Sequence, residues 1–377
     1  MKLAGQVSPY RDLFLFGDFW HDVYLAGPLS CLPDLPWDLP LWSGGQSVFG
    51  DIDYEGKSLC YCIGREVTDY LSGWEVSSMM SESQVFLSVI IVAYRSREEI
   101  EECLMSIPPF VMDQRAEVMV VDNFQQDGIE ALISDKFPSV TYVNPGENLG
   151  FSKANNMGYH QSSGEYILFL NPDTICNEKA LTHCLMRLES ESAIGLISPK
   201  LVMADGGMDL ACRRSIPSLW DGFCRASGLS GRFPNVCLFA GYNLTYLSED
   251  ETYDVGAING AFMMTRRSIL EEVGLFDEAF FMYGDDLDLC YRIGRAGHRI
   301  VYDGRFTVIH LKGLSVAKEY EAMSRAIFDA NKAFYLKHFN PGSHWWIRWK
   351  YEVAFGLWKW LALFRSKLKG SRRVKPI

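Results

Sequence analysis

An uninterrupted apolar run, Tyr166–Leu170, lies near the middle of the chain and is followed by the sequence Asn-Pro-Asp-Thr. Five bulky apolar residues in a row are typical of a strand that is buried on both faces of a parallel sheet. Pro172 stops any helix and fits poorly in a central strand, so we expect the strand to end at Asn171. Asp173 then lies just beyond the carboxyl end of the strand, where open α/β sheets bind ligands. A simple turn in which Asp173 caps the next helix is the alternative.

Shorter apolar runs recur along the chain and alternate with segments in which apolar and charged residues have helical spacing. This alternation predicts an α/β fold with right-handed crossovers and a mostly parallel sheet. Asp122 follows the run 117–121, so a second carboxylate is expected at the same edge of the sheet as Asp173. Residues 200–252 have little pattern, and we expect a variable loop region over the site. The other strands are predicted at 86–94, 140–143, 194–197, 253–264, 298–302 and 306–310, and helices at 97–105, 127–137, 152–161 and 178–189.

Polar residues gather at the predicted start of the helix 152–161. They are Asn148, Asn155 and Asn156, together with Lys153. A helix amino terminus with polar side chains and a cation is suited to binding a diphosphate. The glycine-rich motifs of dinucleotide-binding dehydrogenases and of P-loop nucleotidases are missing from the sequence, which argues against both classes.

A second chemically distinctive segment, residues 276–292, combines aromatic residues with acids. Asp285 and Asp286 fall in the first turn of a helix predicted after Gly284, where the helix dipole favours negative charge. An acidic pair beside aromatic rings also suits a general base that faces a sugar. His310 is predicted at the end of a later strand.

The two ends of the chain differ from its middle. Residues 1–85 contain four basic and twelve acidic side chains, many aromatic residues and several prolines, and predict an accessory module of unknown function. From residue 341 onward there are nine Lys or Arg residues and one acid, Glu352. Charges interrupt the apolar residues of this tail, so none of its runs is long enough to span a bilayer.

The composition of the tail favours an amphipathic helix that lies on anionic lipid, because Trp, Phe and Leu are mixed with Lys and Arg. The alternative is a helix that packs its tryptophans on the main domain. The net charge of −11 argues against nucleic acid as the main partner. Ten scattered cysteines, expected to be reduced, and no evident signal peptide indicate a cytoplasmic protein.

The motifs of residues 86–340, in their order and spacing, resemble glycosyltransferase family 2, the inverting GT-A enzymes, and within it the rhamnosyltransferase-like branch that acts on lipid-linked saccharides. The resemblance implies a Rossmann-like nucleotide-binding sheet flanked by helices, with the accessory module before it and the tail 341–377 after it. The motifs are residues 89–94, 120–123, 148–151, 155–158, 170–173, 259–261 with Arg266 and Arg267, 276–278, 285–292 and 310–315.

The resemblance also implies roles for individual residues. Asp286 is the expected base that deprotonates the acceptor hydroxyl, while Asp173 and His310 are expected to hold Mg²⁺ or Mn²⁺. The donor, a nucleotide-diphosphate sugar, and the acceptor, a lipid-linked saccharide, imply that the enzyme works at the inner face of the cell membrane. Expected donor-binding residues are Ala93, Tyr94, Asp122, Asn148, Lys153, Asn155 and Asn171, and expected acceptor-binding residues are Asn259, Gly260, Tyr283 and Asp285.

Four positions depart from the family pattern. Arg95 replaces a common Asn, Phe124 stands where Ser is usual, Asn171 is neutral where many relatives have Asp, and Asp285 replaces Glu. Two other functions stay open at this point: a sugar nucleotidyltransferase, and a catalytically silent carbohydrate-binding or scaffolding protein. The segment 95–97 lacks the glycine that the first requires, and the presence of Asp173, Asp286 and His310 together argues against the second.

Overall fold

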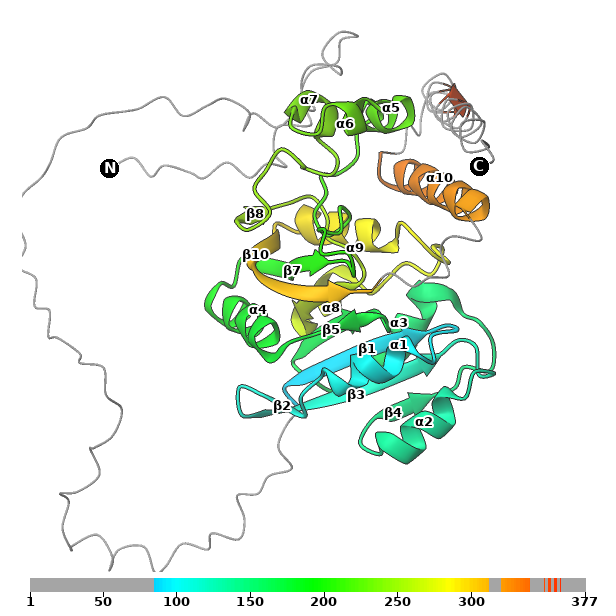
Figure 1. The fold of residues 1–377 in the computed structure, drawn as a ribbon, viewed down its shortest axis with the longest axis vertical. Coiled ribbons are helices and arrows are strands. Elements are labelled where there is room, and N and C mark those ends of the chain that lie inside the picture. The colour runs from blue at the N-terminus through cyan, green and yellow to red at the C-terminus, as the bar shows by residue number, and fades with distance from the viewer. Residues whose placement is uncertain are drawn as a thin grey trace, which may run out of the picture. The chain divides into compact units, whose positions relative to one another are not determined.

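The structure is a computed structural model that describes residues 85–311 and 320–339, and helical positions 349, 352, 353, 356, 357 and 360. The predicted accessory module 1–85 lies outside the described residues, apart from its last residue. Most of the tail 341–377 lies outside them as well. The catalytic domain predicted at 86–340 therefore carries nearly all of the architecture shown in Figure 1.

Within the described residues, ten strands form one sheet, and the order of its main path is β2-β3-β1-β5-β9-β7-β10-β6. β1 is parallel to both β3 and β5, and β7 is parallel to β10, whereas β9 runs antiparallel to its neighbours. The sheet is mixed and mostly parallel, which confirms the predicted α/β class. The strands are β1 (Leu87–Ala93), β2 (Phe110–Val111), β3 (Gln114–Asp122), β4 (Thr141–Val143), β5 (Tyr166–Leu170), β6 (Thr174–Ile175), β7 (Ile194–Val202), β8 (Thr252–Asp254), β9 (Phe262–Arg266) and β10 (Arg299–His310).

The central strand prediction is confirmed, because β5 spans Tyr166–Leu170 and all five side chains are buried. Two other predictions were wrong in detail. The segment 253–264 is not one strand: β8 pairs with β10, β9 pairs with β5, and residues 255–261 form a loop between them. The two strands predicted at 298–302 and 306–310 are one strand, β10, with an irregularity between Asp303 and Thr307 in its pairing with β7.

Helices pack on this sheet (Figure 1). α3 packs against β1 and β3, while α4 and α9 pack against β7 and β10. Gly158 lets α3 approach closely, since a Cβ there would lie 2.5 Å from Ile90 Cγ2. The helices are α1 (Glu99–Met105), α2 (Ile129–Lys136), α3 (Gly150–His160), α4 (Glu178–Ser190), α8 (Arg267–Val273), α9 (Asp285–Arg295) and α10 (Tyr320–His338).

Residues 200–252 are more ordered than the sequence predicted. Three short helices follow β7, namely α5 (Leu219–Ser227), α6 (Leu229–Arg232) and α7 (Cys237–Ala240). α5 begins at a capping box, in which Ser218 and Asp221 satisfy each other's backbone N–H groups, and ends at Gly228 in the left-handed conformation. The capping box and the C-terminal glycine define the ends of α5, although its apolar residues lack the regular spacing from which a helix could be predicted.

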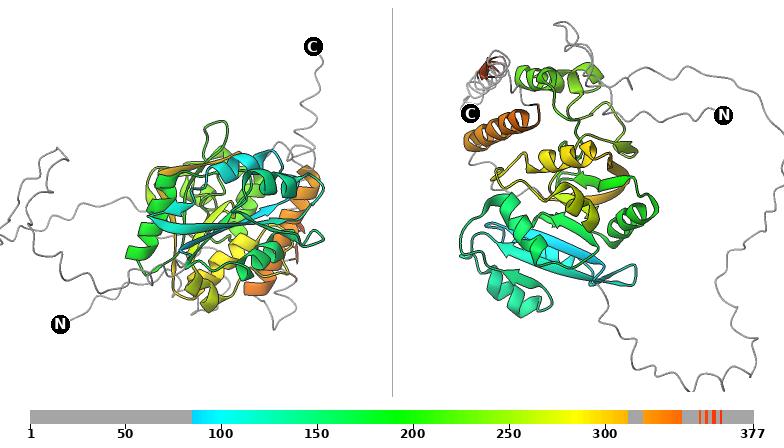
Figure 2. Two further views of the ribbon diagram at one scale, coloured as in Figure 1. Left: turned by 90° about the horizontal axis from the view of Figure 1, so that it is seen from below. Right: turned by 180° about the vertical axis from the view of Figure 1, so that it is seen from behind.

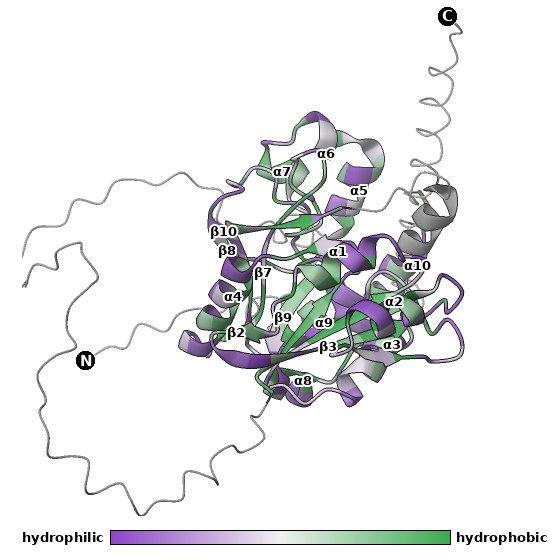
Figure 3. Ribbon diagram, turned by 60° about the horizontal axis from the view of Figure 1, so that its bottom comes forward, coloured by the Kyte–Doolittle hydropathy of each residue, from purple (hydrophilic) through white to green (hydrophobic). Residues whose placement is uncertain are grey.

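The centre of the domain is mainly apolar, while the outer loops and helix surfaces are mainly polar (Figure 3). Within the described residues, no helix has the length and apolar character needed to cross a membrane. Six of the cysteines in the described residues are free and buried. Figure 2 shows the same sheet and helices from below and from behind.

Candidate active site

The ends of β1 and β3 are joined in register, with Ala93 opposite Asp122. The Asp122 side chain is fully buried. Its carboxylate accepts hydrogen bonds from the backbone N–H groups of Phe124 (3.0 Å) and Gln125 (3.1 Å) and from the Tyr142 hydroxyl (3.0 Å). Asp122 therefore shapes the loop after β3, and its expected contact with the donor stays a prediction.

Two residues that depart from the family pattern meet at this edge. The Arg95 guanidinium lies over the rings of Tyr94 (5.3 Å) and Phe124 (4.8 Å), and those two rings pack edge to face. Arg95 and Gln125 both have a positive φ, of 54° and 56°, which is uncommon for residues other than glycine and frequent at functional sites. The sequence identified Tyr94 as a donor-binding candidate but gave no sign that Arg95 and Phe124 would join it.

Two of the amides expected at the diphosphate site, Asn148 and Asn155, form hydrogen bonds with the backbone. Asn148 accepts a hydrogen bond from the N–H of Gly150 (2.9 Å). Asn155 is buried and donates to the Phe151 carbonyl (3.0 Å), and its donor-binding role stays a prediction. Lys153 is exposed in the first turn of α3 and keeps the position required for an approaching anion.

A chain of three side chains lies at the ends of β5 and β10. His310 Nε2 is 3.3 Å from Asp173 Oδ1, and His310 Nδ1 is 3.1 Å from Asp209 Oδ2. Burial alone would lower the pKa of His310, but hydrogen bonds to the two carboxylates raise it to about 9. The sequence placed Asp173 and His310 at separate strand ends, and the structure brings them into contact.

Asp209 is a site residue that the sequence reasoning missed. It is almost completely buried, and it holds His310 from the side away from Asp173. Its Oδ2 also accepts a hydrogen bond from Asn259 (2.9 Å). Asp209 lies in the region 200–252, where the sequence pattern gave no element from which its position could be inferred.

The loop Asn259–Ala261 connects this chain to a second group of residues. Asn259 donates to Asp209, and the N–H of Gly260 donates to Asp286 Oδ2 (3.3 Å). The Ala261 carbonyl accepts from the backbone N–H of Asn171 (3.1 Å). One short loop therefore fixes the positions of Asn171, the Asp173–His310 pair and Asp286 relative to one another.

Asp286 is held in the first turn of α9. Arg214 donates to its Oδ2 (2.6 Å) and also to the Ile258 carbonyl (2.6 Å), while the backbone of Arg214 forms a bridge with Ala257. Arg214 is a second residue that the sequence did not identify. Its long-range pairing with the loop before β9 explains why a residue 72 positions away reaches Asp286.

Asp285 has a different environment from its neighbour. Its side chain is buried, and within the described part of the chain Oδ2 has no hydrogen-bond partner. Burial and the adjacent Asp286 raise the pKa of Asp285 to about 8, so this carboxyl group is protonated at neutral pH. The turn before the helix is strained, because Tyr283 has a φ of 69° ahead of Gly284. Asp285 thus does not offer a charged group to an acceptor.

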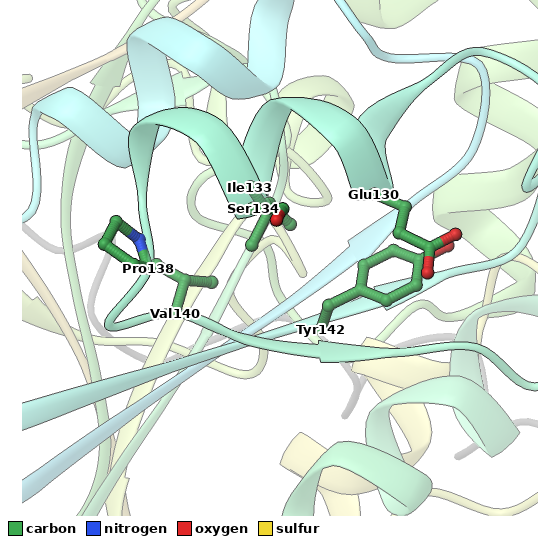
Figure 4. A pocket seen from close by; sticks show the side chains of 6 residues that line it. All are labelled: Glu130, Ile133, Ser134, Pro138, Val140 and Tyr142. Atoms are coloured by element: carbon green, nitrogen blue, oxygen red, sulfur yellow. The ribbon is translucent and has the colours of Figure 1, made fainter.

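Among the described residues, His, Cys, Asp and Glu side chains form no group of three or more suited to a metal ion. A pocket of about 310 Å³ lies between α2 and β4 (Figure 4), and Asp173, Asp286 and His310 are not among the residues that line it. It is lined by Glu130, Ile133, Ser134, Pro138, Val140 and Tyr142.

Comparison with known proteins gives a family match over the centre of the domain. Residues 88–274 match the model of Glycosyl transferase family 2. The chain is 28% identical over 303 residues to an N-acetylglucosaminyl-diphospho-decaprenol L-rhamnosyltransferase of Mycobacterium tuberculosis, covering 77% of this chain and 96% of that protein. It is 27% identical over 234 residues to rhamnosyltransferase WbbL of Escherichia coli, covering 59% and 82%.

Among solved structures, a mannosyltransferase from Pyrobaculum calidifontis in complex with GDP-Man and Mn²⁺ aligns with a TM-score of 0.49 and 17% identity. The alignment covers 78% of this chain and 77% of that one.

Proposed function

Because the chain belongs to glycosyl transferase family 2 and is a glycosyltransferase, we propose that it transfers a sugar, such as rhamnose, from a nucleoside diphosphate to a lipid-linked saccharide. The Mycobacterium tuberculosis relative supports this donor and acceptor, since its name specifies L-rhamnose and a diphospho-decaprenol carrier. The proposed cellular role is the synthesis of a cell-surface polysaccharide. The family match decides against the nucleotidyltransferase and the silent binding protein.

Asp286 carries the proposed chemistry. Its carboxylate takes the proton of the acceptor hydroxyl as that oxygen attacks the anomeric carbon, and the nucleoside diphosphate departs from the opposite face with inversion. Arg214 and the Gly260 N–H both contact Oδ2, which fixes the orientation of the carboxylate before the acceptor arrives. Protonated Asp285 beside it adds no second negative charge that would compete for the proton.

Asp173 and His310 fit the role of holding a divalent cation. They would supply one carboxylate and, after metal binding displaces the proton from the imidazole, one ring nitrogen 3.3 Å from that carboxylate, and such a pair leaves the remaining coordination positions to diphosphate and water. A bound Mg²⁺ or Mn²⁺ would neutralise charge on the departing diphosphate. Asp209 would orient the imidazole of His310, as carboxylates behind metal-binding histidines commonly do.

The tail is proposed to rest on the inner face of the cell membrane. The described positions Trp349, Val353, Leu357 and Trp360 recur at helical spacing and are 48–60% exposed. Exposed Trp and Leu in a basic tail are suited to the boundary between lipid headgroups and acyl chains. Glu352 on the same helix pairs with Lys332 of α10 (2.7 Å), which ties this helix to the catalytic domain.

The single observation that carries the proposal is the connection of Asp286 to Asp173 and His310 through the loop 259–261. The test is to incubate the full chain with a panel of nucleotide sugars, Mg²⁺ or Mn²⁺, and a saccharide diphosphate with a short lipid. The expected product has an anomeric configuration opposite to that of the donor, as determined by NMR. Retention of configuration, or nucleotidyl transfer without glycosyl transfer, would refute the proposal.

A further inference from the structure

Helices α5–α7 carry a group of exposed apolar side chains at some distance along the chain from the tail. Five of them fall within residues 219–238 and are 37–61% exposed. We term this group the α5–α7 patch. Its members are Leu219, Trp220, Phe233, Val236 and Leu238.

Contacts within the three helices hold the patch in shape. The Trp220 ring stacks on Phe223 with centroids 5.4 Å apart, and Phe233 packs against Phe239 at 5.3 Å. The Trp220 indole N–H donates to the Leu238 carbonyl (2.7 Å). The indole N–H of Trp220 therefore has its hydrogen-bond partner within the protein, so burying the rest of the ring in another surface would break no hydrogen bond of this N–H to water.

The exposed charges within the segment that carries the patch, residues 218–241, are of one sign. Asp221 is the only acid between residues 218 and 241, and it is buried in the capping box with Ser218. The exposed charged residues of this segment are Arg225 and Arg232. Trp, Phe and Leu surrounded by Arg form the combination that binds the interface of a bilayer containing anionic lipids.

The patch is also linked to the site residues. α5 begins shortly after Arg214, which holds Asp286, and the Tyr335 hydroxyl of α10 donates to the Pro217 carbonyl. α10 is the same helix that pairs with the tail through Lys332. Figures 1 and 2 show α5–α7 and α10 at the end of the domain away from α2 and β4. α10 therefore contacts both the segment that leads into the patch and the helix of the tail.

We propose that the α5–α7 patch is a second membrane contact, which docks on an anionic bilayer and directs the Asp286 side of the domain towards an acceptor embedded in that bilayer. This inference rests on the proposed lipid-linked acceptor. It adds a surface that acts separately from the tail: the tail attaches the enzyme, and the patch sets its orientation.

The test compares two double variants of the full chain. Phe233→Ser with Leu238→Ser changes the patch, and Met105→Ser with Phe110→Ser is the matched control, because Met105 and Phe110 are 65% and 57% exposed in α1 and β2. The patch variant is expected to bind vesicles of phosphatidylcholine and phosphatidylglycerol about tenfold more weakly than the control. It is also expected to show a higher KM for a long-chain lipid-linked acceptor in those vesicles, with unchanged kinetics on a short-chain soluble acceptor.

Hydrogen exchange of the wild-type chain provides an independent readout that requires no substitution. Vesicles are expected to slow amide exchange in residues 219–240 and to leave residues 105–111 unchanged. Equal vesicle binding by both double variants, together with no slowing in 219–240, would overturn the inference. A change in oligomeric state of the patch variant without a change in vesicle binding would instead identify the patch as an interface between copies. Failure of the proposed function is distinguishable, because the wild type would then not glycosylate the soluble acceptor.

Discussion

At the scale of single residues, the adjacent acids at the start of α9 have different properties. Asp286 is partly accessible and oriented by Arg214, while Asp285 is buried and has a pKa of about 8. We expect Asp286→Asn to lower kcat by about 10²–10⁴-fold, the usual contribution of base catalysis, with donor affinity nearly unchanged. Steady-state kinetics and donor titration measure this. Asp285→Asn is the control and is expected to be the milder change; transfer by Asp286→Asn within about threefold of wild type would exclude Asp286 as the base.

The raised pKa of Asp285 also predicts a pH dependence of stability. The folded state binds this proton more tightly than the unfolded chain, so the contribution to stability is complete below pH about 4 and declines as the pH rises towards about 8. Asn mimics the protonated carboxyl group. Thermal unfolding of Asp285→Asn is therefore expected to show a smaller loss of Tm between pH 6 and 9 than the wild type, and parallel curves for the two proteins would contradict this.

The Asp173–His310 pair predicts metal-dependent binding of the donor. Asp173→Ala removes the carboxylate that lies 3.3 Å from the imidazole and is expected to weaken donor binding by about tenfold or more in Mg²⁺ or Mn²⁺. Without a divalent cation the variant and the wild type should bind the donor alike. Isothermal titration with and without metal measures this, and a metal-independent affinity shared by both proteins would remove Asp173 from the metal site.

At the scale of elements, α10 is attached to α9 by a buried carboxylate. Asp288 accepts hydrogen bonds from His338 (2.6 Å) and Arg292 (2.8 Å) and lies 2.6 Å from Lys337 Nζ. Burial alone would raise the pKa of Asp288, but these three partners lower it to about 2. The carboxylate therefore connects the helix that bears Asp286 to the helix that contacts both the segment that leads into the patch and the helix of the tail.

Because its folded-state pKa is lowered, Asp288 stabilises the protein above pH about 4 and loses this contribution as the pH falls towards about 2. Asp288→Asn is expected to destabilise the protein at neutral pH by about 3 kcal/mol, because Arg292 and Lys337 lose their buried counterion and His338 loses a hydrogen-bond partner. Denaturant unfolding at neutral and acidic pH measures both effects. A difference between variant and wild type that stays constant down to pH about 2 would show that Asp288 is not the titrating group.

The sequence predicted elements best where one periodicity ran without interruption. β5 was predicted correctly because five apolar residues end at a proline, and α9 because acids follow Gly284. The boundary between β8 and β9 was missed since apolar residues continue through the loop. Gly256 lies in this loop, and a larger residue does not fit there, because a Cβ would lie 2.3 Å from the backbone nitrogen of Ile216. Such a contact between segments distant in sequence cannot be read from local pattern.

At the scale of the whole molecule, the sequence predicted which acids lie at the carboxyl edge but not what holds them. Asp173, Asp286 and His310 could be located because each follows or opens a recognisable element. Asp209 and Arg214 could not, because their roles depend on pairing between the region 200–252 and the loop before β9. The sequence also did not predict that the side chains of Asp122 and Asn155 are buried, because the burial of a polar side chain depends on neighbours from other elements.

The last prediction concerns attachment to the membrane. The tail contains nine basic residues and one acid, and Trp349, Val353, Leu357 and Trp360 present an exposed apolar face. Deleting residues 342–377 is expected to lower sedimentation with anionic liposomes by about 10²-fold or more, since apolar and electrostatic contributions are lost together.

Activity of the truncated chain on a soluble acceptor analogue should remain, because Asp173, Asp286 and His310 all precede the deletion. High salt should weaken liposome binding of the full chain and have a smaller effect on the truncated chain, as screening acts on the basic residues. The α5–α7 patch predicts that the truncated chain retains weak binding. If truncation left liposome binding at the level of the full chain, the tail would not be the anchor, and the tryptophans would instead belong to a helix that packs on the domain.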